Sequence, residues 1–293
     1  MFYVPGIFEP RFTVTVRLLA TEAEAMADRF WLFGATAVVE LADSEGFVRL
    51  IGDLTPSGIR GLEAGSLVVG IDPIEADFEL SNEWRKHAQA WVCGNRILLR
   101  PEWVSNDAQQ QQLVDDGSLL EIVLEPGSAF GSGSHATTRL CVGQIAQLDL
   151  SGASVLDVGC GTGVLSVASV LVGAESVLAV DSDPEAIRVT ELVAALNGVS
   201  DKIQTLPAQG FVGDGTEFDL VLANLLLPII EESGAQLATS VAPGGLIMVS
   251  GVLEHQQERV EQVFAEFKLN QVEQEEGWLV LVFERTGFAA SVA

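Results

Sequence analysis

The sequence predicts a doubly wound α/β domain, preceded by a smaller α+β domain. Three observations predict it: strands alternate with helices after residue 150, a glycine-rich loop directly follows a buried strand, and two strands join tightly near the end. Alternation of this kind places parallel strands side by side, with helices as crossovers. The expected strands are 155–158, 176–180, 203–206, 218–223 and 246–250, and the expected helices are 165–173, 184–197, 228–241 and 254–268.

The sheet is expected to end in an antiparallel hairpin. Residues 271–275 and 278–284 read as strands, and only Glu276-Gly277 separates them. Strands joined by so short a turn must be antiparallel. A parallel sheet with this ending differs from the usual dinucleotide-binding layout and matches the methyltransferase variant of the Rossmann-like fold.

The first domain is expected to be ferredoxin-like, because its elements follow the order βαββαβ. Thr21 would cap its first helix, with Glu24 at the capping-box position. The expected strands are 12–18, 36–41, 46–51 and 68–72, and the expected helices are 21–33 and 59–63.

A polar, glutamine-rich stretch at 106–112 reads as a linker between the two domains. We therefore expect a first domain at 1–105, a linker at 106–117 and a second domain at 118–293.

The formal net charge is −26, from 41 acidic and 15 basic residues. Such a charge repels nucleic acid, whose binding needs Lys and Arg to neutralise phosphates. It attracts a basic partner. An acidic bias of a whole proteome, as in a salt-adapted organism, explains the charge equally well. The partner we expect is a basic protein, without direct nucleic-acid binding.

We expect a cytoplasmic protein without a membrane span. The most apolar stretch, 164–174, is interrupted by two serines and a glycine and has about half the length of a spanning helix. The first six residues read as a loop and not as a signal peptide. Cys93, Cys141 and Cys160 are widely spaced, which argues against a disulfide framework or a metal site. No feature fixes the oligomeric state, and a monomer is the working assumption.

The sharpest motif is a glycine loop after the first strand of the larger domain. Residues 155–158 run directly into Gly159-Cys160-Gly161-Thr162-Gly163, and a helix follows. Glycines allow a tight turn and a close approach of a ligand to the backbone. Doubly wound sheets bind ligands at the carboxyl ends of their strands, where this loop lies. Gly159, Gly161 and Gly163 are therefore expected to contact a cofactor.

Two details favour S-adenosylmethionine over a nicotinamide dinucleotide, and a third fits both. The glycine spacing is GxGxG and not the dinucleotide fingerprint GxGxxG. Asp157, inside the strand, suits the positive ammonium of a methionine and would repel a pyrophosphate. Asp181 ends the next strand and can accept both ribose hydroxyls, as in dinucleotide enzymes. The alternative is that Asp157 only caps the loop and the glycines only serve packing.

Two other side chains are chemically capable, and each has a plain alternative. His135 could be a general base or could organise the loop through a hydrogen bond, and we favour the second. Cys160 lies between two glycines, but no base neighbours it in sequence, so we interpret it as a small filler. His87 and His255 are expected at the surface.

One long motif carries a family resemblance. Residues 125–138, EPGSAFGSGSHATT, resemble the D-P-G-x-A-F-G-T-G-x-H-x-T-T signature of the ribosomal protein L11 methyltransferase family. Residues 218–225 resemble that family's D-L-V-V-A-N-I segment. The resemblance covers residues 84–284, and the first 80 residues only in pattern. Further matching segments are 84–87, 95–103, 241–245 and 250–253.

The resemblance implies an S-adenosylmethionine site lined by Thr138, Gly159, Asp181 and Asn224, with Phe130 in a loop that covers the cofactor. It implies methylation of amino groups of a protein, ribosomal protein L11, on lysine side chains, the α-amine or both. The first domain would recognise the substrate. Asn224 would orient the amine through its carbonyl oxygen.

The sequence departs from the family pattern at two places. Ser132 replaces the usual threonine, and Leu225-Leu226-Leu227-Pro228 replaces smaller residues, which could reshape the acceptor pocket. A methyltransferase with another protein or small-molecule acceptor is therefore the alternative. An NAD-dependent oxidoreductase fits less well because of the glycine spacing. A non-catalytic binding module also fits less well, because every expected cofactor residue is present.

Overall fold

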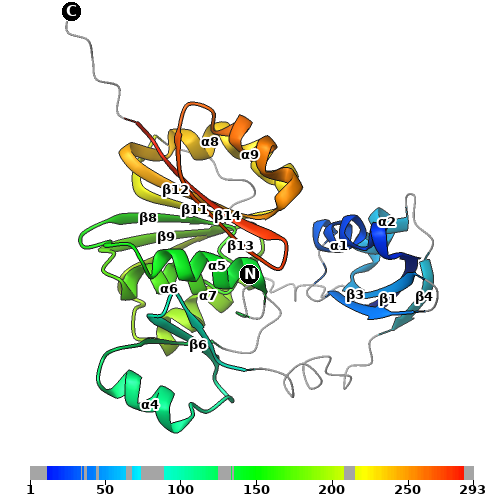
Figure 1. The fold of residues 1–293 in the computed structure, drawn as a ribbon, viewed down its shortest axis with the longest axis horizontal. Helices are drawn as coiled ribbons and strands as arrows, with labels where there is room; N and C mark the ends of the chain where they lie inside the picture. The colour runs from blue at the N-terminus through cyan, green and yellow to red at the C-terminus, as the bar shows by residue number, and fades with distance from the viewer. Residues whose placement is uncertain are drawn as a thin grey trace, which may run out of the picture. The chain divides into compact units, whose positions relative to one another are not determined.

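The computed structural model describes residues 12–33, 35, 38–43, 46–63, 68–73, 89–124, 133, 135–207 and 215–286 (Figure 1). The chain divides into two compact units, Met1–Trp84 and Arg85–Ala293. No described helix combines the length and the apolar character that crossing a membrane requires.

The first unit is a four-stranded sheet with helices. Its strands lie in the order β2-β3-β1-β4, and the paired neighbours are antiparallel. Val14, Val16 and Leu18 alternate along β1 and pack into one core with Phe30 and Leu50. The element order is the βαββαβ order predicted from the sequence, and a ferredoxin-like class stays a prediction. The elements are β1 (Phe12–Leu19), η1 (Ala20–Glu22), α1 (Ala23–Leu32), β2 (Val38–Ala42), β3 (Phe47–Leu54), α2 (Pro56–Glu63) and β4 (Val68–Pro73).

The first helical turn starts earlier than the sequence predicts. The 3-10 turn η1 begins at Ala20 and leads straight into α1, so the capping position is Leu19 and not Thr21. The Leu19 N–H donates to the Glu22 carboxylate at 3.2 Å. The predicted cap at Thr21 is therefore wrong, because a carboxylate at the third helical position already satisfies this backbone donor.

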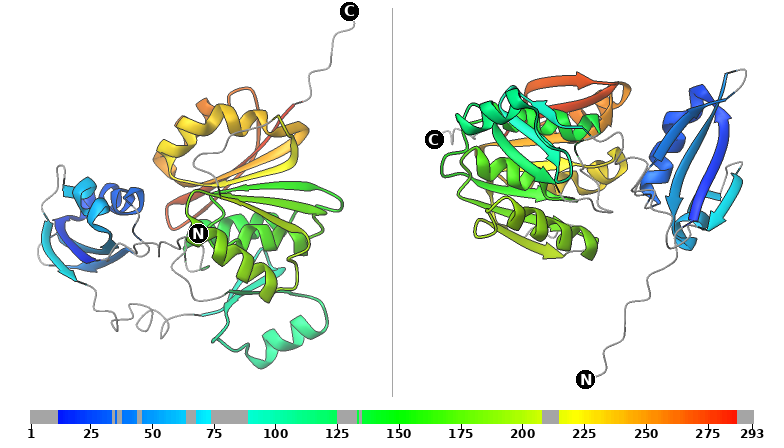
Figure 2. Two further views of the ribbon diagram at one scale, coloured as in Figure 1. Left: turned by 180° about the vertical axis from the view of Figure 1, so that it is seen from behind. Right: turned by 90° about the horizontal axis from the view of Figure 1, so that it is seen from below.

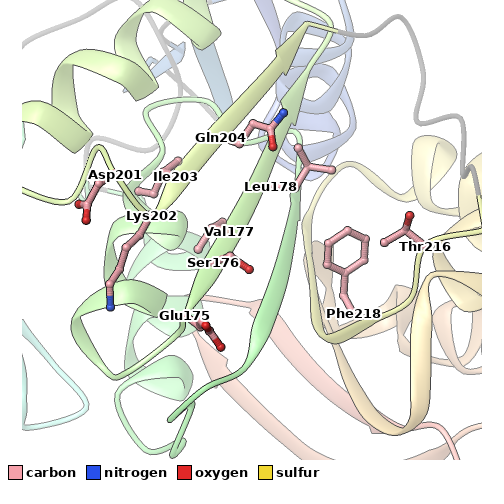
Figure 3. A pocket seen from close by; sticks show the side chains of 10 residues that line it. All are labelled: Glu175, Ser176, Val177, Leu178, Asp201, Lys202, Ile203, Gln204, Thr216 and Phe218. Carbon is pink, nitrogen blue, oxygen red and sulfur yellow. The ribbon is translucent and has the colours of Figure 1, made fainter.

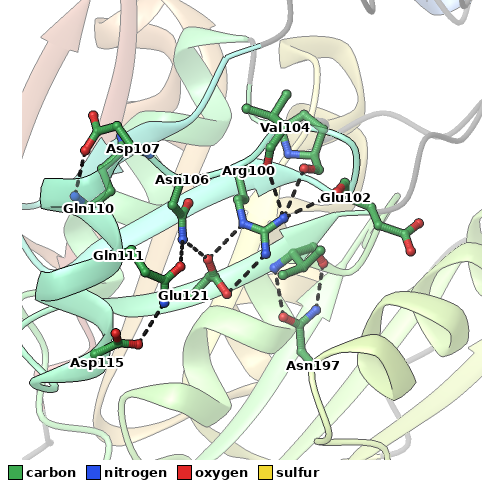
Figure 4. Close-up of polar contacts among 12 residues, drawn as sticks. Arg100, Glu102, Val104, Asn106, Asp107, Gln110, Gln111, Asp115, Glu121 and Asn197 are labelled. Atoms are coloured by element: carbon green, nitrogen blue, oxygen red, sulfur yellow. Dashed lines mark hydrogen bonds and ion pairs between the residues drawn. The ribbon is translucent and has the colours of Figure 1, made fainter.

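The second unit begins with a small sheet that the sequence analysis did not identify. β5 (Trp91–Cys93) is antiparallel to β6 (Ile97–Pro101), and β6 is parallel to β7 (Leu120–Leu124). The crossover between β6 and β7 contains α4 (Ala108–Asp115). Glu121 on β7 accepts hydrogen bonds from Arg100 at 2.8 Å and Asn106 at 2.6 Å, which ties the start of the crossover to its end (Figure 4).

The segment predicted as a linker, 106–117, lies inside the second unit and contains α4. Asp107 Oδ1 accepts the N–H groups of Gln109 and Gln110 at 2.8 Å each, and Gln110 Oε1 accepts the Asp107 N–H at 3.0 Å. Glutamine is a good helix former, so a polar run with this cap makes an exposed helix. The chain divides between Trp84 and Arg85, and not near residue 105.

The larger sheet of the second unit has seven strands in the order β10-β9-β8-β11-β12-β14-β13. Neighbours from β10 to β12 are parallel, β14 is antiparallel to β12, and β13 is antiparallel to β14. The predicted parallel sheet with an antiparallel terminal hairpin is confirmed. The strands are β8 (Ser154–Val158), β9 (Ser176–Asp181), β10 (Ile203–Pro207), β11 (Phe218–Asn224), β12 (Val241–Leu253), β13 (Lys268–Glu275) and β14 (Trp278–Glu284).

Helices cover both faces of this sheet (Figures 1 and 2). α5, α6 and α7 contribute to one core cluster, and α8 and α9 to another. Along β8, Val155 belongs to the first cluster and Leu156 to the second, as expected where side chains alternate between two buried faces. The helices are α5 (Ala136–Ile145), α6 (Val164–Leu171), α7 (Pro184–Leu196), α8 (Leu227–Thr239) and α9 (Gln257–Val263), the last preceded by η2 (Glu254–Gln256).

Asn197, at the end of α7, joins the small sheet to the rest of the unit. Its Oδ1 accepts the Val123 N–H at 2.9 Å, and its Nδ2 donates to the Val123 carbonyl at 2.8 Å (Figure 4).

We expect Asn197→Ala to lower the free energy of unfolding by about 1–3 kcal/mol, because both backbone groups of Val123 lose this partner. Urea denaturation followed by tryptophan fluorescence measures the change.

The control for this prediction is Asn270→Ala. Asn270 is exposed and donates to Glu284 at 2.9 Å, so its removal should change the free energy by less than about 0.5 kcal/mol. Equal losses in the two variants would contradict the bridging role of Asn197.

Candidate functional site

The glycine loop connects β8 to α6 at the carboxyl edge of the sheet. Gly159, Gly161 and Gly163 have φ values of 72°, 56° and 74°, the left-handed region that other residues rarely adopt. A Cβ on Gly159 would lie 2.5 Å from Leu225 Cδ2, and a Cβ on Gly163 would lie 2.7 Å from Thr190 Cγ2. Both positions require glycine for backbone conformation, and Gly163 requires it for space as well, because the Thr190 Cα lies 3.1 Å from that Cβ position. At Gly159 the end of the Leu225 side chain would have to move.

The end of β9 holds this loop in place. The Val180 carbonyl accepts the N–H groups of Gly159 at 2.8 Å and Cys160 at 3.1 Å. The Asp181 carboxylate accepts the Gly161 N–H at 3.0 Å and the Asp183 N–H at 2.9 Å. Each carboxylate oxygen can accept more than one hydrogen bond, so Asp181 keeps capacity for a ligand.

Asp157 lies beneath the loop and is 1% exposed. The Ser166 hydroxyl, on α6, donates to its carboxylate at 2.6 Å. Burial raises the pKa of the Asp157 carboxyl to about 6, with the hydrogen bond from Ser166 opposing and the charge of Asp181 adding to the rise. Asp157 thus ties the strand before the loop to the helix after it.

His135 caps helix α5. Its Nδ1 accepts the Thr137 N–H at 3.3 Å and lies 2.8 Å from Thr137 Oγ1. Burial, with the charge of Arg139 acting in the same direction, lowers the pKa of His135 to about 4. A neutral imidazole whose Nδ1 already accepts a backbone N–H fits the loop-organising interpretation better than a general base.

Thr138 and Asn224 complete the edge. Thr138 is fully buried, and its hydroxyl has no hydrogen-bond partner among the residues that the structure describes. Asn224 ends β11, and its Nδ2 lies 3.4 Å from Thr137 Oγ1. Thr137 therefore lies between the capping histidine and Asn224, a role that sequence reasoning missed because α5 and β11 are far apart along the chain.

Two further interpretations are decided by burial. Cys160 is buried, its Sγ lies 3.3 Å from Thr190 Oγ1, and burial raises the pKa of its thiol, which fits a filler and not a nucleophile. Leu227, the first residue of α8, is 3% exposed and packs in the core, so it is not among the leucines that could reshape the acceptor pocket. Leu225, in contrast, packs on the glycine loop.

Several sequence predictions concern other parts of the chain. Phe130 and His87 lie outside the described residues, as do 125–132 of the long motif. His255 is exposed, as expected. Within the described ranges no group of three or more His, Cys, Asp or Glu side chains could hold a metal ion.

A cavity of about 390 Å³ lies away from this edge (Figure 3). Its lining includes Ser176, Ile203 and Phe218, the first residues of β9, β10 and β11. Ligands of doubly wound sheets bind at the opposite, carboxyl ends. The full lining is Glu175, Ser176, Val177, Leu178, Asp201, Lys202, Ile203, Gln204, Thr216 and Phe218.

A seven-stranded sheet with an antiparallel hairpin and a glycine loop at its carboxyl edge defines a class I methyltransferase domain. The model of the ribosomal protein L11 methyltransferase family matches residues 66–286. The chain therefore belongs to the ribosomal protein L11 methyltransferase family.

Individual relatives agree with this assignment. The ribosomal protein L11 methyltransferases of Haemophilus ducreyi and Pasteurella multocida are each 34% identical over 248 residues, which is 84% of this chain and 80% of each relative. The crystal structure of the ribosomal protein L11 methylase from Lactobacillus delbrueckii subsp. bulgaricus is 30% identical, with a TM-score of 0.58. It covers 65% of this chain and 95% of its own.

We expect Asp157→Asn to change how stability depends on pH. The pKa of Asp157 is about 6 in the folded chain and about 3.9 in an unfolded one, so the free energy of unfolding falls as pH rises through this window. Asparagine has no charge to bury. The free energy of unfolding of the variant should therefore rise relative to that of the wild type as pH rises, by up to about 3 kcal/mol above pH 6. Urea denaturation between about pH 4 and 7 measures the difference.

Asp201→Asn is the matched control, because Asp201 lies exposed in a turn. Its unfolding should follow the wild-type pH curve. A constant difference between Asp157→Asn and wild type across the window would contradict the burial argument.

Proposed function

We propose that this chain transfers methyl groups from S-adenosylmethionine to amino groups of ribosomal protein L11, on lysine side chains, the α-amine or both. The observation that carries the proposal is the similarity over 84% of the chain to relatives named for this substrate. A ribosomal substrate places the reaction in the cytoplasm. The net charge of −26 favours association with a basic protein.

The residues at the carboxyl edge fit S-adenosylmethionine. The buried Thr138 hydroxyl lacks a partner among the described residues, so a ligand group can supply one. The backbone of Gly159, Gly161 and Gly163 permits close approach, and Asp181 can accept ribose hydroxyls. The negative charge of Asp157 beneath the loop favours a positive ammonium, and Phe130 would cover the cofactor, by family resemblance.

When bound, S-adenosylmethionine supplies a methyl group made electrophilic by its sulfonium, and the protein supplies orientation. The main task of this chain is therefore to place the acceptor amine in line with the methyl group. Asn224 can accept an amine N–H at its carbonyl oxygen, because its Nδ2 is turned to Thr137. Enclosure in the site lowers the pKa of a lysine amine from about 10.4, which helps it to arrive without its proton.

The first unit would recognise the substrate. A second candidate function is methylation of another protein or of a small molecule, and the packing of Leu225 over the glycine loop favours it, since larger residues there narrow the acceptor side. Family membership removes an NAD-dependent oxidoreductase as an alternative.

Mass spectrometry of purified ribosomal protein L11 after incubation with the protein and S-adenosylmethionine tests the proposal. Mass gains in multiples of one methylene group, located by peptide mapping, are expected. Binding of S-adenosylhomocysteine by calorimetry without any mass gain would discard L11 as the substrate and keep the transferase. Absence of binding would overturn the cofactor assignment.

We expect Thr138→Val to weaken cofactor binding without loss of stability. Valine has a similar shape and removes a buried hydroxyl that lacks a protein partner, so the free energy of unfolding should stay the same or rise. Affinity for S-adenosylhomocysteine should fall about tenfold, the effect of one hydrogen bond. Calorimetry and urea denaturation measure the two effects.

Thr190→Val is the matched control. The Thr190 hydroxyl donates to the Gly161 carbonyl at 3.1 Å, so this variant should lose stability, unlike Thr138→Val. Unchanged cofactor affinity in Thr138→Val would remove Thr138 from the binding site.

We expect Asn224→Ala to lower turnover, on the order of 100-fold, because a misplaced amine loses the in-line geometry. Affinity for S-adenosylhomocysteine should fall much less. Steady-state methylation of L11 and calorimetry give the two quantities, and unchanged turnover would refute the orienting role of Asn224.

A further inference from the structure

A buried arginine lies next to the site but outside the proposed cofactor contacts. Arg139 directly follows Thr138 in the first turn of α5 and is 6% exposed. A buried guanidinium needs paired charges, because burial of an unpaired ion is costly. The partners of Arg139 therefore show which elements of the fold this side chain joins.

The partners of Arg139 come from two other elements. Its Nε donates to Glu275 Oε1 at 2.8 Å, and its Nη2 lies 2.6 Å from the same oxygen and 3.1 Å from Glu276 Oε1. Its guanidinium carbon lies 4.3 Å from the centroid of the Trp91 ring, on β5. Glu275 ends β13, and Glu276 with Gly277 forms the turn to β14, with φ values of 52° and 84°.

This turn lies at the same edge of the sheet as Asn224. Asn224 pairs with Ser250 in the parallel strands β11 and β12. Three residues further along β12, Leu253 pairs with Trp278, the first residue of β14. The hairpin turn is thus placed at the carboxyl edge, where acceptor and cofactor must meet.

A second contact joins the same two segments. The rings of His135 and Trp278 meet edge to face, with centroids 4.9 Å apart. The first turn of α5 is therefore held to the hairpin at both His135 and Arg139. Between these two points lie Thr138 and Thr137, and Thr137 contacts Asn224.

We propose that Arg139 is a positioning residue for methyl transfer: by holding the turn 275–278 against α5, it fixes Trp278 and, through Thr137, the orientation of Asn224. This rests on the proposed function. In this role Arg139 acts through Trp278 and Asn224, and not by a contact of its own with cofactor or acceptor. Its loss should impair the placement of the acceptor amine more than cofactor binding, because the glycine loop is held separately by β9 and α6 and only Thr138 of the proposed cofactor contacts lies in this turn of α5.

Three variants test the contact from both sides. Arg139→Gln removes the charge of the buried side chain. Glu275→Gln removes the charge of its main partner, which is 37% exposed, and keeps an amide oxygen that can accept from Arg139. Arg139→Lys keeps the charge without the forked geometry. For Arg139→Gln and Glu275→Gln we expect turnover on L11 to fall about tenfold to a hundredfold, with affinity for S-adenosylhomocysteine within about threefold of wild type. Arg139→Lys should recover part of the turnover.

The double variant Arg139→Gln/Glu275→Gln distinguishes positioning from general damage. If the two side chains act as one unit, the double variant should be no slower than the slower single variant. Additive losses would overturn the proposal. So would a loss of cofactor affinity as large as the loss of turnover.

Arg285→Gln is the matched control. Arg285 pairs with Glu217 at 2.8 Å, and its neighbour Glu284 pairs with Leu246, at the opposite edge of the sheet. Its turnover should equal that of wild type. A turnover loss equal to that of Arg139→Gln would contradict a role specific to the carboxyl edge.

Hydrogen–deuterium exchange tests, without any substrate, whether Arg139 holds the turn 275–278 against α5. In Arg139→Gln, amide exchange should rise in peptides that cover 135–139 and 275–279 and stay unchanged in those that cover 155–166. Unchanged exchange at the hairpin would overturn the proposal. Wild-type protein that leaves L11 unmodified would refute the proposed substrate instead, and the exchange result would still decide whether Arg139 holds the turn.

Discussion

The left-handed backbone of the glycine loop is the constraint on which the rest of the site depends. Leu225 Cδ2 and Thr190 Cγ2 occupy the space that a Cβ on Gly159 and Gly163 would need. Leu225 follows Asn224 directly, and Thr190 lies in α7, so the loop sets how closely both elements approach β8. A side chain at Gly163 would meet the backbone of Thr190, whose Cα lies 3.1 Å from the Cβ position, so the loop and α7 would have to move apart. A side chain at Gly159 would displace the Leu225 side chain, next to Asn224, where the proposed acceptor contact lies.

The same edge concentrates groups that do not favour stability. Asp157 is buried with a pKa raised to about 6, and the Thr138 hydroxyl is buried without a partner among the described residues. Each buried polar group left unpaired costs about 1–3 kcal/mol. A ligand that carries both an ammonium and a carboxylate supplies complementary groups for these side chains. The free protein thus carries a cost in stability that a bound ligand would remove. This is the pattern expected where residues serve binding more than folding.

The sequence predicted most elements after residue 150 to within a few residues, because buried strands and amphipathic helices carry a local periodic signal. The helix expected at 254–268 was predicted too long, because α9 ends at Val263 and Lys268 already begins β13. β12 is the second exception. It was expected only at 246–250, since Pro243-Gly244-Gly245 reads as a turn. The strand in fact runs from Val241 to Leu253, and it accommodates these residues by an irregular register opposite Phe218 and Leu220. Local pattern cannot show which pairing accommodates a break.

The site followed the same division. The glycines, Asp157 and Asp181 stand in one strand–loop–helix–strand segment, and hydrogen bonds join Gly161 to Asp181 and Gly159 to Val180. The contact of Thr137 with Asn224 joins residues 87 apart, and that of Arg139 with Glu275 joins residues 136 apart. No motif spans such separations. The glutamine run at 106–112 failed for another reason: an exposed helix and a linker have the same composition, and only the Asp107 cap distinguishes them.

The division of the chain bears on where substrate choice would arise. The family match begins at residue 66, so it includes only residues 66–84 of the first unit, Met1–Trp84, and nearly all of the second. The second unit contains every described residue assigned to the cofactor and to amine orientation. The residues proposed for methyl transfer therefore lie in the part of the chain with the strongest family evidence, whereas our proposal gives the first unit a part in acceptor choice. If the acceptor differs from L11, the first unit and Leu225 and Leu226, after Asn224, are the places where the chain would encode that difference.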